Sequence, residues 1–159
     1  MNQEALEVAV GRLLTAKNMT VALAESCTGG LVGHRLTEVP GSSNYFLGGI
    51  VCYANSAKER LLGVSQDTLL AHGAVSAETA LEMARGARRE LGTDIGLSVT
   101  GIAGPTGGTP DKPVGLVYIA LATPKGERCE RHVWDSDRSG NKALSAEAAL
   151  ELLRRYLEG

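Results

Sequence analysis

The fold is decided by the stretch Thr20–Glu38, which reads TVALAESCTGGLVGHRLTE. Its first five residues are typical of a strand, and Glu25–Gly30 follows them as a short polar turn that ends in two glycines. The remaining residues, as far as about Glu38, are compatible with a helix. The stretch therefore predicts a strand, a tight turn and a helix in direct succession.

Helical and strand patterns alternate on both sides of this stretch. Helices are expected over about Gln3–Lys17, Asn55–Leu62, a short segment capped by Ser65, Ser76 to about Leu91, and about Ser139–Leu157. Strands are expected over Gly48–Tyr53, which looks buried, Asp94–Val99, Gly115–Ala122 and about Arg128–Trp134. Because a turn at Pro124–Gly126 joins the last two strands in a hairpin, the pattern predicts an α/β fold. We expect a three-layer α/β/α sandwich with a mixed, mostly parallel sheet of about five strands, in one domain over residues 1–159.

The composition is ordinary for a soluble domain. The 159 residues carry 16 basic and 18 acidic side chains, a net charge of -2, and the isoelectric point is about 5.9. Binding to a phosphate backbone usually requires a basic patch, so we expect no nucleic-acid partner. No apolar stretch approaches the roughly 18 residues that span a bilayer, and the amino terminus lacks the charge pattern of a signal peptide. We therefore expect a cytoplasmic protein with no membrane partner.

Cysteine and histidine are too scattered to form a disulfide framework or a metal site. No CxxC, HxH or HExxH pairing occurs among Cys27, Cys52, Cys129, His34, His72 and His132. The cysteines are expected to be small buried side chains.

Three strand ends carry polar residues, and in sheets of this class ligands lie beyond the carboxyl ends of the parallel strands. The turn Ser26–Gly30 leads into a helix whose main-chain N–H groups favour an anion, and Thr100–Gly104 repeats the pattern at another strand end. Together the two turns predict a nucleotide-like ligand. The alternative is that glycine and serine serve turn geometry alone.

The third strand end, Tyr53–Lys58, carries a candidate base. With Asn55 as N-cap, Lys58 occupies the third helical position, where the helix dipole disfavours a positive charge and lowers the pKa of the lysine. Such an amine can act as a general base, and the Tyr53 hydroxyl can relay or orient the proton. The alternative is an ordinary surface lysine at a helix start.

Four side chains are candidate nucleophiles: Ser26, Cys27, Ser42 and Ser43. A serine beside Gly29 and Gly30 is better placed to hold a ligand, whereas the loop Pro40–Ser43 can expose a serine. No GxSxG motif or Asp/His couple indicates a Ser-His-Asp triad. A Ser-Lys pair is the remaining nucleophilic arrangement.

Six motifs, in this order, resemble the motif set of the CinA carboxy-terminal domain family, the PncC-type nicotinamide mononucleotide deamidases. They are AESCTGG at 24–30, VPGSS at 39–43, YANSAK at 53–58, HGAVS at 72–76, VTGIAGP at 99–105 and KPVG at 112–115. The resemblance covers essentially the whole chain. It implies an amidohydrolase that converts nicotinamide mononucleotide to nicotinic acid mononucleotide and ammonia in bacterial pyridine nucleotide salvage, with no cofactor and no metal. It also implies a stand-alone form, without the molybdopterin-binding-like amino-terminal domain of many CinA proteins.

On matching positions, the resemblance makes Ser43 the nucleophile, Lys58 its base and Tyr53 an assistant. In this form the hypothesis requires Ser43 and Lys58 to share one cleft beside the mononucleotide. The substrate is expected among Ser26, Thr28, Gly29, Asn55, Thr100, Gly101 and Arg138. Arg138 stands for the phosphate-binding arginine of a Gly-Asp-Arg-like motif, which reads DSDR at 135–138 and lacks the glycine.

Some alternatives stay open. The chain could be a catalytically silent nucleotide-binding or regulatory module of the same family, although every polar residue expected of the active enzyme is present. Another small amide could be the substrate. The small size and the glycine-rich strand ends favour a homodimer.

Overall fold

Five segments pair into one mixed sheet in a computed structural model that describes residues 4–159. They are β1 (Val21–Glu25), β2 (Phe46–Val51), β3 (Ile95–Gly101), β4 (Leu116–Thr123) and β5 (Gly126–Val133), in the order β2-β1-β3-β4-β5. β1 pairs in parallel with β2 and β3, whereas β4 is antiparallel to β3 and β5. The predicted hairpin is confirmed, and it makes β4 the strand that runs against the other four described strands.

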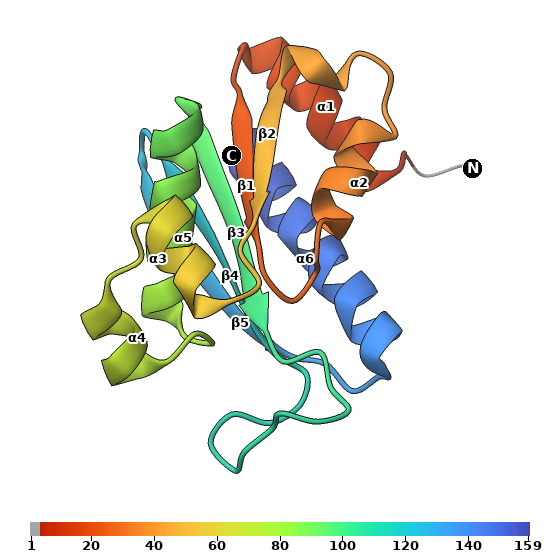
Figure 1. Cartoon of the computed structure of the whole chain (residues 1–159). Coiled ribbons are helices and arrows are strands. Elements are labelled where there is room, and N and C mark those ends of the chain that lie inside the picture. Colours follow the sequence, from red (N-terminus) through yellow and green to blue (C-terminus); the bar gives the residue numbers. More distant parts are fainter. Residues whose placement is uncertain (1–3) are drawn as a thin grey trace.

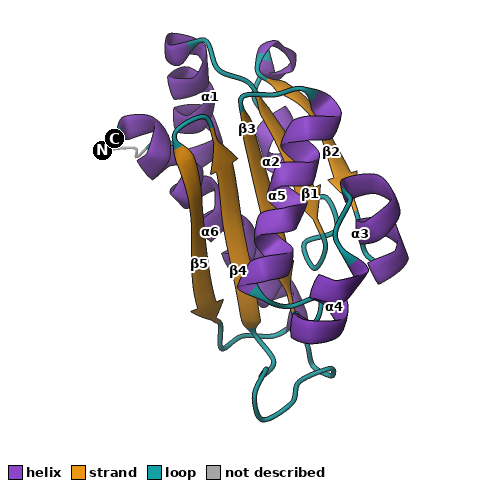
Figure 2. Ribbon diagram, turned by 90° about the vertical axis from the view of Figure 1, so that its left-hand side faces the viewer, coloured by secondary structure: helices purple, strands orange, loops and turns teal. Residues whose placement is uncertain are grey.

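Helices cover both faces of the sheet and make three layers, which confirms the predicted sandwich (Figures 1 and 2). One face packs on α1 (Leu6–Lys17), α2 (Leu31–Thr37) and α6 (Arg138–Glu158) around a core of large aliphatic side chains. The other face packs on α3 (Asn55–Leu62), α4 (Gln66–His72) and α5 (Ala77–Leu91). A 3-10 turn, η1 (Ser42–Asn44), precedes β2.

Small residues bring α5 close to its neighbours. A Cβ at Gly96 of β3 would collide with the carbonyl oxygen of Ala84 in α5, and a Cβ at Gly86 would collide with that of Leu62 in α3. Glycine is needed here because the backbones themselves are in contact. This contact seats α3 against α5 and fixes the helix that carries Lys58.

Most predicted helix ends are confirmed. Ser65 caps α4 by accepting from the N–H of Asp67 (3.2 Å), and Ser76 caps α5 by accepting from that of Thr79 (3.2 Å). Gly63 ends α3 in the left-handed conformation, with a φ of 68°. The predicted start of the first helix at Gln3 lies outside the described residues.

Two expectations are wrong. Asn55 is not the N-cap of α3: Ala54 holds that position without a side-chain hydrogen bond, and Asn55 is the first helical residue. Lys58 is therefore the fourth helical residue rather than the third. The strand predicted over Gly48–Tyr53 is not fully buried, because β2 lies at the edge of the sheet and its residues are alternately half-buried and exposed.

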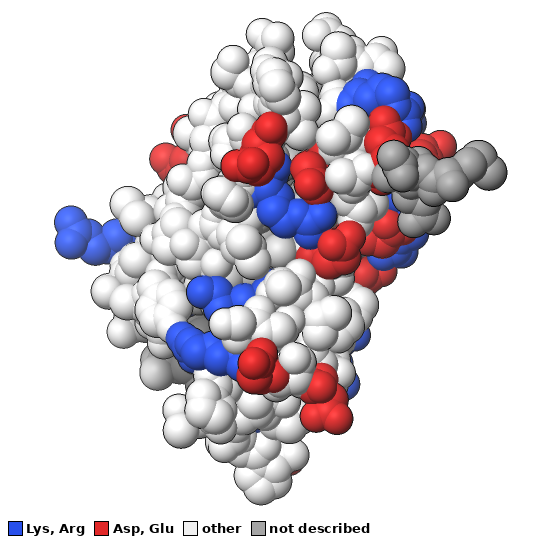
Figure 3. Space-filling view, turned by 90° about the vertical axis from the view of Figure 1, so that its right-hand side faces the viewer, with Lys and Arg blue, Asp and Glu red and all other residues white. Residues whose placement is uncertain are grey.

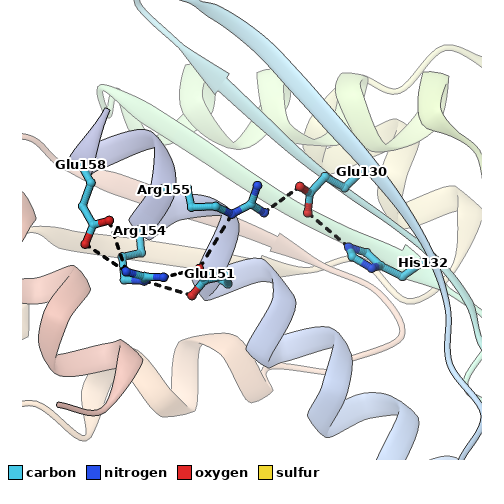
Figure 4. Close-up of polar contacts among 6 residues, drawn as sticks. All are labelled: Glu130, His132, Glu151, Arg154, Arg155 and Glu158. Atoms are coloured by element: carbon cyan, nitrogen blue, oxygen red, sulfur yellow. Dashed lines mark hydrogen bonds and ion pairs between the residues drawn. The ribbon is translucent and has the colours of Figure 1, made fainter. Parts of the chain in front are cut away.

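Ion pairs join α6 to β5 and also link successive turns of α6. Arg155 binds Glu130 of β5 at 2.6 Å, Glu130 also contacts His132, and Arg154 pairs with Glu151 and Glu158 (Figure 4). Acidic and basic side chains likewise intermingle on the face formed by α1 and α2 (Figure 3). None of the helices within residues 4–159 is both long and apolar enough to cross a membrane.

Candidate active site

The turn after β1 is held by a buried carboxylate. Glu25, the last residue of β1, is 3% exposed, and its Oε1 accepts from the Thr28 hydroxyl (2.6 Å) and from the N–H of Val32 (2.9 Å). Its Oε2 accepts from the N–H of Gly33 (3.0 Å). Glu25 thus caps α2, whose N-cap residue, Gly30, offers no side chain.

This capping corrects the expected use of the turn. The free N–H groups of the first turn of α2 were expected to bind an anion, but two of them already donate to Glu25. The N–H groups of Cys27 and Thr28 are different, because neither makes a hydrogen bond within residues 4–159. Thr28 is buried and directs its hydroxyl to Glu25, so its side chain holds the turn rather than facing a ligand.

Lys58 lies in the first turn and a half of α3 and is buried, with 1% of its surface exposed. Its Nζ donates to the carbonyl oxygens of Cys52 (2.9 Å) and Tyr53 (3.3 Å) and lies 3.1 Å from the Ser26 hydroxyl. Among the described residues, no carboxylate lies within ion-pair distance of this amine. Removal from water therefore lowers the pKa of Lys58 below its ordinary value.

An uncharged amine can make all three of these contacts, as a charged one can. A neutral amine has two N–H groups, which the two carbonyl oxygens can accept, and one lone pair, which can accept from the Ser26 hydroxyl. Ser26 is buried next to this lone pair, and its own N–H donates to the carbonyl oxygen of Val99 (3.0 Å), which ties the turn to β3. Ser26 and Lys58 thus form the Ser-Lys pair that the sequence left as the remaining nucleophilic arrangement.

The expected convergence of Ser43 with Lys58 is not found within the chain. Ser43 lies exposed in η1, before the start of β2, whereas Lys58 follows the end of that strand. The six residues of β2, at roughly 3.3 Å each, separate the two ends by about 20 Å. The 3-10 turn that carries Ser43 precedes β2, and α3, which carries Lys58, follows the opposite end of that strand (Figure 1).

One pocket of about 230 Å³ gathers most of the predicted residues. The predicted residues that line it are Ser26, Tyr53, Asn55, Lys58, Thr100, Gly101 and Arg138, and they are joined by Cys27, Ala74, Val75 and Ala103. Thr100 also braces the wall of the pocket, since its hydroxyl donates to the carbonyl oxygen of Ala74 (2.8 Å). The strand ends of β1, β2 and β3 therefore meet in one site, as the topology predicts.

Tyr53 and Arg138 face each other across the mouth of this pocket. Arg138, the first residue of α6, donates to the Tyr53 hydroxyl (3.0 Å) and to the carbonyl oxygen of Gly104 (2.7 Å). The Tyr53 side chain is exposed, and in the described structure its hydroxyl contacts Arg138 rather than Lys58. Its main-chain oxygen, not its hydroxyl, is the group that Lys58 contacts.

Sequence reasoning missed two charged residues. Lys142 lies one helical turn after Arg138 and so on the same face of α6, and a Cβ at Gly29 would lie 3.9 Å from its Nζ. The i, i+4 spacing from Arg138 could have indicated it. Glu25 was seen only as part of a polar turn, because its role depends on the chain folding back onto it.

Other candidates do not offer this chemistry. Burial raises the pKa of Cys27 to about 12, so its thiol is unsuited to act as a nucleophile. A larger hollow, of about 670 Å³, lies between α1 and α6, but ion-paired arginines and glutamates line it and it contains no nucleophile. Within residues 4–159, no three His, Cys, Asp or Glu side chains cluster as metal ligands would.

Comparisons with known proteins agree on one family. The model of the CinA C-terminal domain matches residues 3–157. A CinA-like protein of Salinibacter ruber is 55% identical over 96% of this chain, and a putative competence-damage inducible protein of Halothermothrix orenii is 53% identical over 94% of it. The chain spans 37% and 36% of the lengths of these two relatives.

Solved structures show the same fold over whole chains. The competence/damage inducible protein CihA from Agrobacterium tumefaciens is 40% identical, with a TM-score of 0.88 and complete coverage of both chains. A CinA superfamily protein from Klebsiella pneumoniae is 31% identical, with a TM-score of 0.93 over 96% of each chain.

Proposed function

Since this chain belongs to the CinA C-terminal domain family, we propose that it is an amidohydrolase that uses Ser26 as nucleophile and Lys58 as base. Its substrate is nicotinamide mononucleotide, and its products are nicotinic acid mononucleotide and ammonia, a step of pyridine nucleotide salvage. The observation that carries the proposal is the buried contact of 3.1 Å between the Ser26 hydroxyl and the Lys58 amine. A lysine without a carboxylate partner and with a lowered pKa is the base that a serine nucleophile needs.

The reaction follows from the positions of these two groups. Neutral Lys58 takes the proton of Ser26 while the serine oxygen attacks the carboxamide carbon, which gives a tetrahedral intermediate. Lys58 then returns this proton to the departing nitrogen, so that ammonia leaves and an ester on Ser26 remains. Water, deprotonated by the same amine, hydrolyses the ester to the carboxylic acid and restores Ser26.

The tetrahedral intermediate carries a negative oxygen that needs donors. The N–H groups of Cys27 and Thr28 follow the nucleophile directly and have no other acceptor within the described residues. We assign the oxyanion to them. Loss of one such donor typically lowers the rate about 10²–10³-fold.

The rest of the pocket suits a mononucleotide. Arg138 lines the pocket, and Lys142 lies outside the lining but on the same face of α6 and close to Gly29. At this end of α6 the helix dipole also favours an anion, and the two cations would hold the substrate phosphate. Ala74 and Val75 provide apolar surface beside the nucleophile for the pyridine ring.

The test is ammonia release from nicotinamide mononucleotide, measured alongside nicotinamide riboside, nicotinamide and dinucleotides. The variants Ser26→Ala and Lys58→Met should each lose at least about 10³-fold in kcat, because removing either member of such a pair disables the nucleophile. Ser43→Ala is the matched control and should keep near-normal turnover. Normal turnover in Ser26→Ala would disprove the assignment, and binding of the mononucleotide by the wild-type protein without ammonia release would favour a catalytically silent module.

A further inference from the structure

We infer that Glu25 is a positioning residue of this site: its carboxylate fixes the turn 26–30 so that Ser26 faces Lys58 and the N–H groups of Cys27 and Thr28 stay free for the oxyanion. The inference rests on the proposed function, because it presumes that Ser26 is the nucleophile. Glu25 forms no ion pair with Lys58 in the described structure and acts through the turn that it holds instead.

The first argument is how the carboxylate is used. Both oxygens of Glu25 accept hydrogen bonds, and all three donors come from residues that follow it within eight positions. The chain therefore folds back on its own strand end, and the nucleophile lies between the carboxylate and its donors in the sequence. A side chain that is 3% exposed and held at three points fixes the turn in one conformation.

The second argument is which donors it takes and which it leaves. Glu25 satisfies the Thr28 hydroxyl and the N–H groups of Val32 and Gly33, the groups that would otherwise attract an anion to the start of α2. The N–H groups of Cys27, Thr28 and Gly30 are left without acceptors in the described structure. Two of these three free donors directly follow Ser26 in the chain, so Glu25 leaves the donors next to the nucleophile available for an anion.

The third argument concerns charge. A carboxylate so near a developing oxyanion would disfavour it; the pKa of the neighbouring Cys27 thiol is raised mainly by burial and, to a smaller extent, by the charge of Glu25. Three hydrogen bonds and the amino-terminal end of α2 offset the charge of Glu25. An isosteric amide would remove the charge but would break the network, because its NH₂ group would face an N–H donor. Glu25→Gln therefore changes charge and geometry together, whereas Thr28→Val removes one hydrogen bond of the network and keeps the charge of Glu25.

The experiment uses Glu25→Gln, with Thr28→Val as a milder second variant that removes one donor. The matched control is Asp94→Asn, because Asp94 also accepts from a backbone N–H and a hydroxyl, both of Thr20, but at the far end of the sheet. Ammonia release from nicotinamide mononucleotide and the rate at which diisopropyl fluorophosphate labels Ser26 are measured on folded protein. We expect Glu25→Gln to lower kcat and the labelling rate about 10–100-fold and Thr28→Val about 3–10-fold, with KM within about twofold of the wild type.

The outcomes separate the inference from the proposed function. Asp94→Asn should lose stability but label at the wild-type rate. Wild-type labelling in folded Glu25→Gln, or in Thr28→Val if the first variant does not fold, overturns the positioning role. If the wild type labels at Ser26 but releases no ammonia, nicotinamide mononucleotide is not the substrate. The labelling rates of the variants, compared with that of the wild type, then decide the role of Glu25. Failure of the wild type to label at Ser26 overturns both.

Discussion

At the scale of single residues, the site depends on one lysine that the fold has removed from water. Lys58 is as buried as the aliphatic core, yet within residues 4–159 its amine has only neutral partners: two carbonyl oxygens and the Ser26 hydroxyl. The sequence predicted the direction of its pKa shift from the helix dipole. In the structure, burial is the main cause.

This burial predicts how activity depends on pH. The base must be uncharged, and the pKa of Lys58 lies below its ordinary value of 10.5. Activity should therefore rise with pH through this lowered pKa and reach its plateau before pH 10.5, and it should fall as the amine is protonated at lower pH. The measurement is kcat/KM for ammonia release between pH 5 and 10. A profile that is flat over this range, or still rising steeply at its upper end, would contradict the role of Lys58.

At the scale of elements, the first two turns of α6 complete the pocket. Asp137 caps the helix by accepting from the N–H of Gly140 (2.7 Å), and Asn141 donates to the carbonyl oxygen of Ala103 (2.9 Å). These contacts tie α6 to the loop after β3. They place Arg138 and Lys142 beside the turn that carries Ser26.

Arg138 and Lys142 should favour a substrate that carries a phosphate over one that does not. Arg138→Met and Lys142→Met should each raise KM for nicotinamide mononucleotide about 10-fold or more, since a charged hydrogen bond is worth about 1.5–3 kcal/mol. The kcat/KM for nicotinamide riboside, which lacks the phosphate, should stay within about twofold. Lys125→Met, in the exposed turn between β4 and β5, is the control and should change neither value. An equal loss for both substrates would show that the cations do not bind the phosphate.

The contact between α3 and α5 can be tested by two helical glycines. A Cβ at Gly86 would collide with the backbone of Leu62, so Gly86→Ala should lower the free energy of unfolding by about 1–3 kcal/mol. At Gly33 the nearest atom to a new Cβ is 3.5 Å away, so Gly33→Ala should be neutral or stabilising by about 0.5–1 kcal/mol. Urea denaturation of both variants measures the difference. Equal effects would mean that the close approach of the helices does not require glycine.

At the scale of the whole molecule, function and stability oppose each other at Lys58. Its pKa is lowered on folding, so below the folded pKa the buried charge costs stability in full. The cost disappears as pH rises from the folded pKa to the unfolded value of about 10.5, because there the unfolded chain binds more protons. A homodimer stays a prediction, which sedimentation velocity would test.

Lys58→Met should therefore be inactive but more stable than the wild type. At pH 7 we expect the free energy of unfolding to increase by about 1–2 kcal/mol, because the variant buries an apolar side chain of similar length. The gain should shrink as the pH approaches 10.5. Urea denaturation at pH 7 and pH 10 gives both values. A variant that is less stable than the wild type at pH 7 would indicate that the bonds of Lys58 outweigh its desolvation.

The sequence by itself determined the alternation of strands and helices, the hairpin of β4 and β5, the caps at Ser65 and Ser76, and the strand ends that carry the site. These features depend on periodicity and on local turn chemistry, which act over a few residues. The sequence also left a Ser-Lys pair as the predicted nucleophilic arrangement. The resemblance assigned the nucleophile to Ser43, but local patterns do not distinguish it from Ser26, because both serines lie in small-residue turns beside glycine.

The proposal of Ser26 rests on the tertiary structure alone. Parallel pairing of β1 with β2 brings the ends of the two strands together, so Ser26 after β1 meets Lys58 after β2, while Ser43 before β2 is left at the opposite end. The sheet order made β2 an edge strand, and the folding back of the chain gave Glu25 its donors. Burial and proximity depend on residues far apart in the chain, and local patterns contain no information about which of them meet.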